Sequence, residues 1–169
     1  MFASSRPGAP REAKIIDMDA IDRKILALLQ ANGRMAFTEL AAEVQLSVSR
    51  CQRRVRDLRA DGVIRDYRGV IDAKKVGLGF EVIAFATLAH PDAIHDFDLA
   101  VEAVPEIVEA QRLFGEPDYF IRIVAADREA YQRLYDERLS KLPGLRSLNS
   151  TIVMKEVVAA RGLPLDHGR

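Results

Sequence analysis

Residues 46–62, LSVSRCQRRVRDLRADG, combine an apolar stripe with a row of arginines. Arginine can form two hydrogen bonds to guanine, glutamine can pair with adenine in the same way, and both can also bind phosphate. If the segment is a helix that begins at Ser47, positions i, i+4 and i+7 place Cys51, Val55 and Leu58 on one stripe. The other side then carries Ser49, Gln52, Arg53 and Arg56. This pattern predicts a DNA-reading helix, with a merely solvated basic face as the alternative.

Two shorter helices are predicted before this segment. The first covers residues 19–31, with Asp19 as N-cap and Asn32-Gly33 as its end. The second covers residues 38–44, with Thr38 as its cap and Leu40, Ala41 and Val44 facing inward. Only Gln45 and Leu46 separate it from the basic helix, which is enough for a tight turn. Three helices in this arrangement predict a helix-turn-helix of the winged type, whose last helix enters the major groove.

Charge is divided unevenly along the chain. The whole sequence carries 25 basic and 25 acidic residues, but residues 1–70 hold 13 lysines and arginines against 9 aspartates and glutamates. Residues 71–169 hold 12 against 16. Such an asymmetry indicates a nucleic-acid partner for the N-terminal part and not for the acidic part.

Composition limits the kinds of protein to which this chain can belong. A chain of 169 residues with 49% hydrophobic residues can form one large or two small cores. Its apolar runs are too short to span a membrane, and residues 1–16 read as a disordered arm and not as a signal peptide. The single cysteine, Cys51, excludes an intrachain disulfide and leaves a zinc site without partners. We therefore predict a cytoplasmic protein without cofactor or metal.

A linker is predicted between the helical head, residues 17–62, and the second half of the chain. Gly62 is a candidate helix C-cap, and residues 63–71 alternate in the manner of a strand. Gly77 and Gly79 flank Leu78 and indicate a flexible joint. The linker is accordingly assigned to residues 63–80, with the domain boundary near Val76.

From residue 81 onward, strands alternate with helices. Strands are predicted at residues 81–90, 106–114, 118–126 and 147–157, and helices at residues 93–104 and 128–142. The order βαββαβ is that of the ferredoxin-like sandwich, so the whole chain is predicted to be α+β. This domain is assigned to residues 81–157, followed by a C-terminal tail, 158–169.

The predicted strands are apolar on both faces. In the first strand Val82 and Ala84 alternate with Ile83 and Phe85, and in the third Phe120 opposes its apolar neighbours. Helices cover one face of such a sheet only, and a large exposed apolar face is rare in a soluble monomer. We therefore expect two subunits to pack sheet against sheet, which also supplies the two-fold symmetry that a palindromic DNA site requires.

These features together resemble one known family. Residues 21–78 closely resemble the helix-turn-helix and linker of the leucine-responsive regulator/AsnC (Lrp/AsnC) family of prokaryotic transcription factors. The second half, with FGEPDYFIRIV at residues 114–124, resembles the family's ligand-sensing domain. The resemblance implies homodimers that assemble into tetramers or octamers on double-stranded DNA. It also implies a small effector, commonly an amino acid, bound between dimers.

The resemblance also implies roles for individual residues. The part of the third helix that faces DNA in the family matches Ser47, Ser49, Arg50, Gln52, Arg53 and Arg56. Ser47 has the alternative role of helix N-cap, and Thr38 either binds a phosphate or caps its helix. Arg54 lies beside the buried stripe, so it contacts either a phosphate or an acidic neighbour. Arg50, Arg53 and Arg56 are the preferred DNA contacts.

For the effector, the matching segment is the turn before the third strand, together with nearby strand ends. Gly115 permits a positive φ, and Asp118 can accept a hydrogen bond from an α-ammonium group. Pro117 removes one backbone donor, and a plain hairpin turn is the alternative reading. The full set of candidate effector residues is Gly115, Glu116, Pro117, Asp118, Tyr119, Ser150 and Thr151.

Two other functional classes compete with this interpretation. An enzyme would have to use His90, His95 and the nearby aspartates, but the metalloprotease spacing HExxH and a phosphate-binding glycine loop are missing from the sequence. We therefore predict that the protein is not an enzyme. A non-specific DNA-packing protein without ligand sensing needs the same basic head, and the sequence leaves that alternative open.

Overall fold

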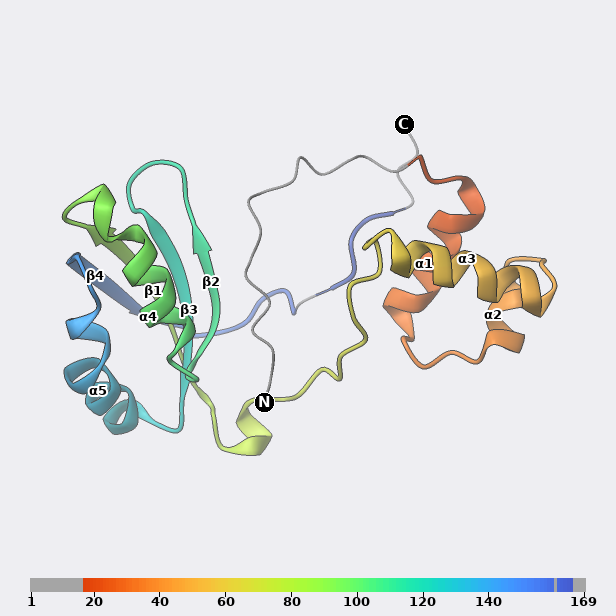
Figure 1. The fold of residues 1–169 in the computed structure, drawn as a ribbon. Coiled ribbons are helices and arrows are strands. Elements are labelled where there is room, and N and C mark those ends of the chain that lie inside the picture. The colour runs from red at the N-terminus through yellow and green to blue at the C-terminus, as the bar shows by residue number, and fades with distance from the viewer. Residues whose placement is uncertain (1–16, 160, 166–169) are drawn as a thin grey trace, which may run out of the picture. The chain divides into compact units, whose positions relative to one another are not determined.

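The computed structural model describes residues 17–159 and 161–165, which form two compact units. One unit contains residues 17–68 and 161–165, and the other contains residues 69–159. The division falls inside the linker that the sequence predicts for residues 63–80. The arm expected at residues 1–16 lies outside the described residues. Figure 1 shows the helical unit and the sheet-containing unit, which are described separately below.

Three helices form the first unit, hereafter the head: α1 (Ala20–Ala31), α2 (Phe37–Glu43) and α3 (Val48–Ala60). The predicted cap of α1 is confirmed, because the Asp19 side chain accepts a hydrogen bond of 2.8 Å from the Asp22 backbone N–H. Gln45 adopts φ 55° in the turn between α2 and α3. This left-handed residue is unusual for a side chain other than glycine, and it makes the tight turn possible.

One expected cap is wrong. Helix α2 begins at Phe37, so Thr38 lies inside the first turn and does not cap it. Its N-cap position is occupied by Ala36, which has extended backbone geometry and makes no side-chain capping bond. Alanine has no oxygen with which to accept a backbone N–H. This short helix therefore begins without a polar cap, and its buried residues, Leu40 and Ala41, lie in its second half.

The inward residues predicted for α2 and α3 are confirmed. Ile25, Leu40 and Cys51 are each fully buried, and Ala41, Val44, Val55 and Leu58 are nearly so. These side chains come from all three helices, so the head has one core to which every helix contributes. The stripe of α3 that faces this core is the one predicted from the sequence.

An ion-pair network ties α3 to α1. The Arg54 guanidinium lies 2.8 Å from a carboxylate oxygen of Asp19 and 2.8 Å from one of Asp22. The hydrogen bond to Asp22 is the main reason why the pKa of Arg54 is raised. The pKa of Asp19 is lowered, chiefly by the hydrogen bond from the Asp22 backbone N–H and also by Arg54. Arg54 thus joins α3 to the start of α1 through two charge-assisted contacts.

The strand expected at residues 63–71 is not formed. Gly62, the predicted C-cap, lies one residue beyond the observed C-cap, Asp61, and has φ 74°. Residues 65–72 have no regular secondary structure. A strand needs a neighbour whose backbone completes its hydrogen bonds, and among the described residues none pairs with this segment. One short 3-10 turn, η1 (Lys74–Val76), follows and ends at Gly77, whose φ is 81°.

The second unit, hereafter the sensor domain, is built on an antiparallel sheet in the order β2-β3-β1-β4 (Figure 1). Its strands are β1 (Phe80–Leu88), β2 (Ile107–Arg112), β3 (Tyr119–Ala125) and β4 (Leu145–Ile152). Its helices are α4 (Ile94–Glu102) and α5 (Arg128–Glu137), with 3-10 turns η2 (Pro91–Ala93) and η3 (Leu139–Lys141). The predicted βαββαβ order is confirmed.

Two elements end five residues before their predicted ends. Helix α5 ends at Glu137 and not at residue 142, because Arg138 leaves helical geometry with φ −128° and η3 follows. Strand β4 ends at Ile152 and not at residue 157. Beyond Val153, whose backbone N–H donates to the carbonyl of Glu81, the neighbouring strand β1 offers no further partner.

Both helices of the sensor domain cover the same face of the sheet. Phe97 and Val101 of α4 and Leu134 of α5 pack in one core with alternate residues of β1 and β3. Those strand residues are Val82, Ala84, Ala86, Leu88, Tyr119, Ile121 and Ile123. The opposite face of the sheet carries the strand residues that alternate with these, because successive side chains of a strand point to opposite faces.

That opposite face, hereafter the open face, is apolar at its centre. Phe85 and Phe120 are cross-strand partners, with ring centroids 6.0 Å apart, and Ile83 lies on the same face of β1. All three remain partly exposed. Arg122 and Glu81 form an ion pair at the edge of this patch, with Nε and Oε1 2.5 Å apart. The structure thus confirms that the strands are apolar on both sides.

Over residues 17–159 and 161–165, no helix is both long and apolar enough to cross a membrane. The same residues contain no group of three or more histidine, cysteine, aspartate or glutamate side chains that could hold a metal ion.

The Arg54 network predicts a loss of stability that depends on pH. Arg54→Ala is expected to lower the unfolding free energy of the head at pH 7 by about 1 kcal/mol, because the pairs are partly exposed and screened. Since the pKa of Asp19 is lowered on folding, its contribution is present above about pH 4 and is lost as the pH falls further. Urea unfolding followed by circular dichroism at pH 7 and pH 3 measures both effects.

Arg53→Ala is the matched control, because Arg53 is an exposed arginine of the same helix. Equal stability of the two variants at pH 7, or a difference that persists at pH 3, would contradict the role assigned to the network.

Candidate nucleic-acid interface and effector site

Helix α3 presents a basic face opposite its buried stripe. Cys51, Val55 and Leu58 point into the core, and the side chains between them are exposed, except for the half-buried Arg54. The exposed set contains the predicted DNA contacts Ser49, Arg50, Gln52, Arg53 and Arg56. Among the described residues, no carboxylate lies within 4.0 Å of the Arg50 or Arg53 guanidinium. Their donors are therefore available to phosphate or base edges.

Ser47 is the N-cap of α3. Its hydroxyl oxygen accepts a hydrogen bond of 3.4 Å from the Arg50 backbone N–H and lies 3.3 Å from the Ser49 hydroxyl. This is the capping role that the sequence offered as an alternative to a DNA contact. The cap also fixes where the helix starts, and thereby which side chains its first turn presents.

Arg54 differs from its neighbours on α3. Its side chain is 30% exposed and is held by Asp19 and Asp22. Of the two roles that the sequence allowed, the structure shows the contact with acidic neighbours. Thr38 is exposed on the first turn of α2, where its hydroxyl makes no cap.

Two exposed apolar side chains at the starts of α2 and α3 are not among the residues predicted from the sequence. Val48, the first residue of α3, is 37% exposed, and Phe37, the first residue of α2, is 40% exposed. Phe37 lines a shallow pocket of about 430 Å³ with five residues of α3, among them Gln52, Arg56 and Arg59. Exposed apolar groups beside a basic face can contact thymine methyl groups. A large apolar residue at the start of each helix was the available signal.

Arg59 extends the basic surface beyond the predicted set. It is exposed in the last turn of α3, and its guanidinium carbon lies 5.8 Å from the centre of the Tyr67 ring. This cation–π contact orients Arg59 without neutralising its charge.

The predicted effector turn is clamped to the end of β1. The Asp118 carboxylate accepts a hydrogen bond of 2.7 Å from the Leu88 backbone N–H, and the Asp118 N–H donates to the Ala86 carbonyl at 3.0 Å. Gly115 has φ 127°, a conformation that favours glycine, and a Cβ there would meet open space. One carboxylate oxygen of Asp118 is thus used to hold the turn against β1.

The outer part of this turn is charged and aromatic. Glu116 forms an ion pair with Arg146 at the start of β4. Phe114 is fully exposed, which is exceptional for a phenylalanine in a single subunit. The turn and the first residues of β4 therefore form one surface, with Pro117 between Glu116 and Asp118.

The remaining predicted effector residues lie elsewhere on the sheet. Ser150 is two residues from Leu148 on the helix-covered side of β4, where its hydroxyl lies 2.6 Å from the Tyr131 hydroxyl. Thr151, the next residue, points to the opposite face. The structure thus brings Gly115, Glu116, Pro117 and Asp118 together, and separates Ser150 and Thr151 from each other.

Tyr119 is buried beneath α4 and does not face the turn surface. Its hydroxyl donates a hydrogen bond of 2.6 Å to the Asp98 carboxylate. Burial, with help from this bond, raises the pKa of Tyr119 far above its usual range. Tyr119 is therefore a neutral donor at any physiological pH, and its contact anchors α4 to β3.

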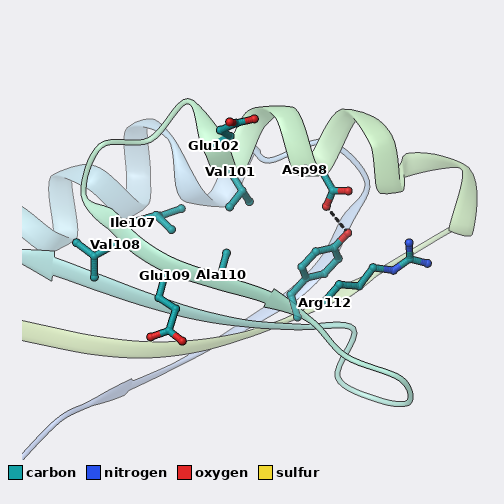
Figure 2. A pocket seen from close by; sticks show the side chains of 9 residues that line it. Asp98, Val101, Glu102, Ile107, Val108, Glu109, Ala110 and Arg112 are labelled. Carbon is teal, nitrogen blue, oxygen red and sulfur yellow. Dashed lines mark hydrogen bonds between the residues drawn. The ribbon is translucent and has the colours of Figure 1, made fainter. Parts of the chain in front are cut away.

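A cavity of about 360 Å³ adjoins this contact, between α4 and β2 (Figure 2). Figure 2 shows Asp98 and Val101 projecting from α4 toward the strand, and Glu102 and Glu109 pointing away from the space between them. Of the predicted effector residues that the structure describes, Tyr119 alone lines this cavity. The cavity and the turn are therefore separate features of the sensor domain.

Family models match most of the chain. The model described as winged helix-turn-helix DNA-binding matches residues 18–65, and the model described as Lrp/AsnC ligand binding domain matches residues 81–163. The two matches cover the head and the sensor domain respectively.

Two relatives are regulators by their names, in agreement with the two family models. The chain is 36% identical over 142 residues to the leucine-responsive regulatory protein of Haemophilus influenzae, a match that covers 83% of this chain and 86% of the relative. It is 30% identical over 151 residues to the DNA-binding transcriptional activator DecR of Escherichia coli K12, covering 88% and 99%.

Solved structures share the fold. The transcriptional regulator NMB0573 of Neisseria meningitidis, solved as an L-Met complex, superposes with a TM-score of 0.84 at 33% identity, covering 89% of this chain and 99% of that one. An AsnC family transcriptional regulator from Agrobacterium tumefaciens superposes with a TM-score of 0.81 at 34% identity, covering 88% and 98%. With both of its domains matched, this chain belongs to the Lrp/AsnC family of DNA-binding transcriptional regulators.

Proposed function

We propose that this protein binds a specific pseudo-palindromic DNA site as a homodimer or a higher oligomer, and that an amino acid or related metabolite changes its assembly or its DNA affinity. The observation that carries the DNA-binding part is the exposed basic face of α3, whose opposite stripe is fully buried. The exposed arginines are concentrated where a helix-turn-helix meets the major groove. Its work on DNA is expected to take place in the cytoplasm.

The exposed centre of the open face supports the dimer. Phe85, Phe120 and Ile83 form an apolar patch on the side of the sheet that the helices leave uncovered. A second copy of the same face would bury this patch, and a two-fold axis through it would relate the two heads. Tetramers and octamers require a further surface, for which the exposed Phe114 beside the predicted effector turn is the candidate.

Three features support an amino acid as the effector. The sensor domain matches the family's ligand-binding model, and the neighbour NMB0573 was solved as an L-Met complex. In this chain Asp118 can offer its second carboxylate oxygen to an α-ammonium group, and the turn beside it supplies backbone groups. A ligand bound between dimers would then link effector concentration to assembly.

The main alternative is a DNA-packing protein that reads no sequence. The two functions predict different responses to DNA sequence, because phosphate contacts alone bind all duplexes equally. The protein is titrated with a duplex from upstream of its own gene and with a scrambled duplex of equal length, at about physiological salt. A preference above roughly 1,000-fold is expected for a sequence-reading regulator. Equal, salt-sensitive binding would favour packing.

The basic face predicts a specific effect of Arg53→Ala. Loss of a bidentate base contact is expected to weaken binding to the specific duplex by about 1–3 kcal/mol and to relax sequence preference at one position. Competition titrations with single base-pair variants of the site measure both effects. Arg133→Ala, a change at an exposed arginine of α5, is the control and should leave binding unchanged. A uniform weakening on every duplex would show that Arg53 contacts phosphate only.

The open face predicts that Phe120→Asp separates the dimer. A buried carboxylate at the centre of an apolar interface should weaken association by about 2 kcal/mol or more, roughly 30-fold. Sedimentation velocity over a concentration series gives the dissociation constant. Leu99→Asp introduces the same charge at an exposed leucine of α4 and should leave association unchanged. Equal association of both variants and the parent protein would place the interface elsewhere.

The effector turn predicts that Asp118→Asn impairs ligand binding while the fold is kept. The asparagine carbonyl can still accept the hydrogen bond from the Leu88 N–H, but the negative charge for an α-ammonium group is lost. Calorimetric titration with each amino acid should show affinity reduced about tenfold or more for the one that binds. Unchanged affinity, with an unchanged thermal unfolding midpoint, would remove Asp118 from the ligand site.

A further inference from the structure

The C-terminal tail returns to the head after the sensor domain is complete. Leu165 packs against the core of the head, whose partly buried neighbours include Met18, Leu29 and Ile64. Leu163 and Leu165 also line a groove of about 700 Å³ on the head, between α1 and the segment that follows α3. An apolar side chain seated on a core is held by the area that it removes from water.

Two hydrogen bonds fix the backbone of the tail at Leu163. The Gln30 amide nitrogen donates to the Leu163 carbonyl at 3.2 Å, and the Gln30 amide oxygen accepts from the Leu163 N–H at 2.6 Å. One glutamine of α1 thus satisfies both backbone polar groups of one tail residue. Such pairing specifies the register of the tail, which an apolar contact alone does not.

Gly162 lets the tail approach α1 closely. A Cβ at this position would lie 3.0–3.1 Å from atoms of the Gln30 side chain, which is tighter than ordinary van der Waals contact. Gly162, Gln30 and Leu165 therefore form one docking arrangement, hereafter the tail dock. It is separate from the basic face of α3.

The chain therefore connects the two units twice. It leaves the head after Arg68 to build the sensor domain, and it rejoins the head at the tail, residues 161–165. The last strand before the tail is β4, which carries the candidate effector residues Ser150 and Thr151. A domain joined by one linker can rotate freely within the reach of that linker, whereas a second attachment removes much of that freedom.

We propose that the tail is a strap that couples the sensor domain to the DNA-binding head. While the tail dock is intact, the chain attaches the head to the sensor domain at two points, the linker after Arg68 and the tail. A change at β4 that displaces the tail releases the attachment at the tail dock. The regulatory part rests on the proposed function, because it requires an effector. The docking part does not.

Hydrogen exchange of the full-length protein tests the docking. Leu165→Asp, Gln30→Leu and a truncation after Ala159 should each accelerate amide exchange in residues 21–31 and 63–68 by about tenfold. Exchange in the sheet of the sensor domain should be unchanged. Arg161→Asp is the matched control, because it adds the same aspartate to the tail at an exposed residue that does not line the groove. Unchanged exchange in the first three proteins would overturn the proposal.

The same variants test the coupling. In the parent protein the effector, found by titrating each amino acid, changes DNA affinity, and Leu165→Asp should reduce that change at least about threefold. Calorimetry should show that the variant still binds the amino acid. A full effector response in Leu165→Asp with accelerated exchange would overturn the coupling and leave the tail as part of the head. If the parent protein binds no amino acid, the proposed function fails, while the exchange result still decides the docking.

Discussion

Burial of one stripe of α3 is the constraint on which the head depends. Cys51, Val55 and Leu58 complete the core that α1 and α2 begin, and the same burial fixes which side chains face solvent. Successive residues of a helix are about 100° apart, so a shift of one position would turn arginines toward the core. The hydrophobic effect thus orients the DNA-binding face. Arg54, at the border of the stripe, is accommodated by two carboxylates of α1.

In the sensor domain, burial of one face of the sheet likewise determines which residues face outward. Alternate residues of β1 and β3 pack beneath α4 and α5, and the others form an apolar open face. One face stabilises the subunit, and the other is available to a second copy. The turn that holds Asp118 is fastened to the end of β1, so the predicted effector surface and the packed sheet share backbone hydrogen bonds. The proposed ligand turn and the open face of the sheet are therefore neighbours within the sensor domain.

Local signals in the sequence predicted most elements of the fold. The Asp19 and Ser47 caps and the 3.6-residue periodicity placed α1 and α3 within about a residue of their observed starts. Features that depend on distant partners were missed or misjudged. The strand expected at residues 63–71 lacks a neighbour, the Tyr119 hydroxyl meets a carboxylate 21 residues away, and Leu165 docks on a helix near the other end of the chain. Periodicity reports which face is apolar, but it does not report what covers that face.

The proposed regulation requires that effector binding and DNA binding are linked in one molecule. The most direct measurement is the affinity for the specific duplex, together with the mass of the assembly, in the presence and absence of each of the amino acids in turn. If the two are linked, at least one amino acid is expected to change the DNA affinity about fivefold or more, or to change the oligomer that binds. Constant affinity and constant mass with every amino acid would contradict the account and favour a DNA-packing protein.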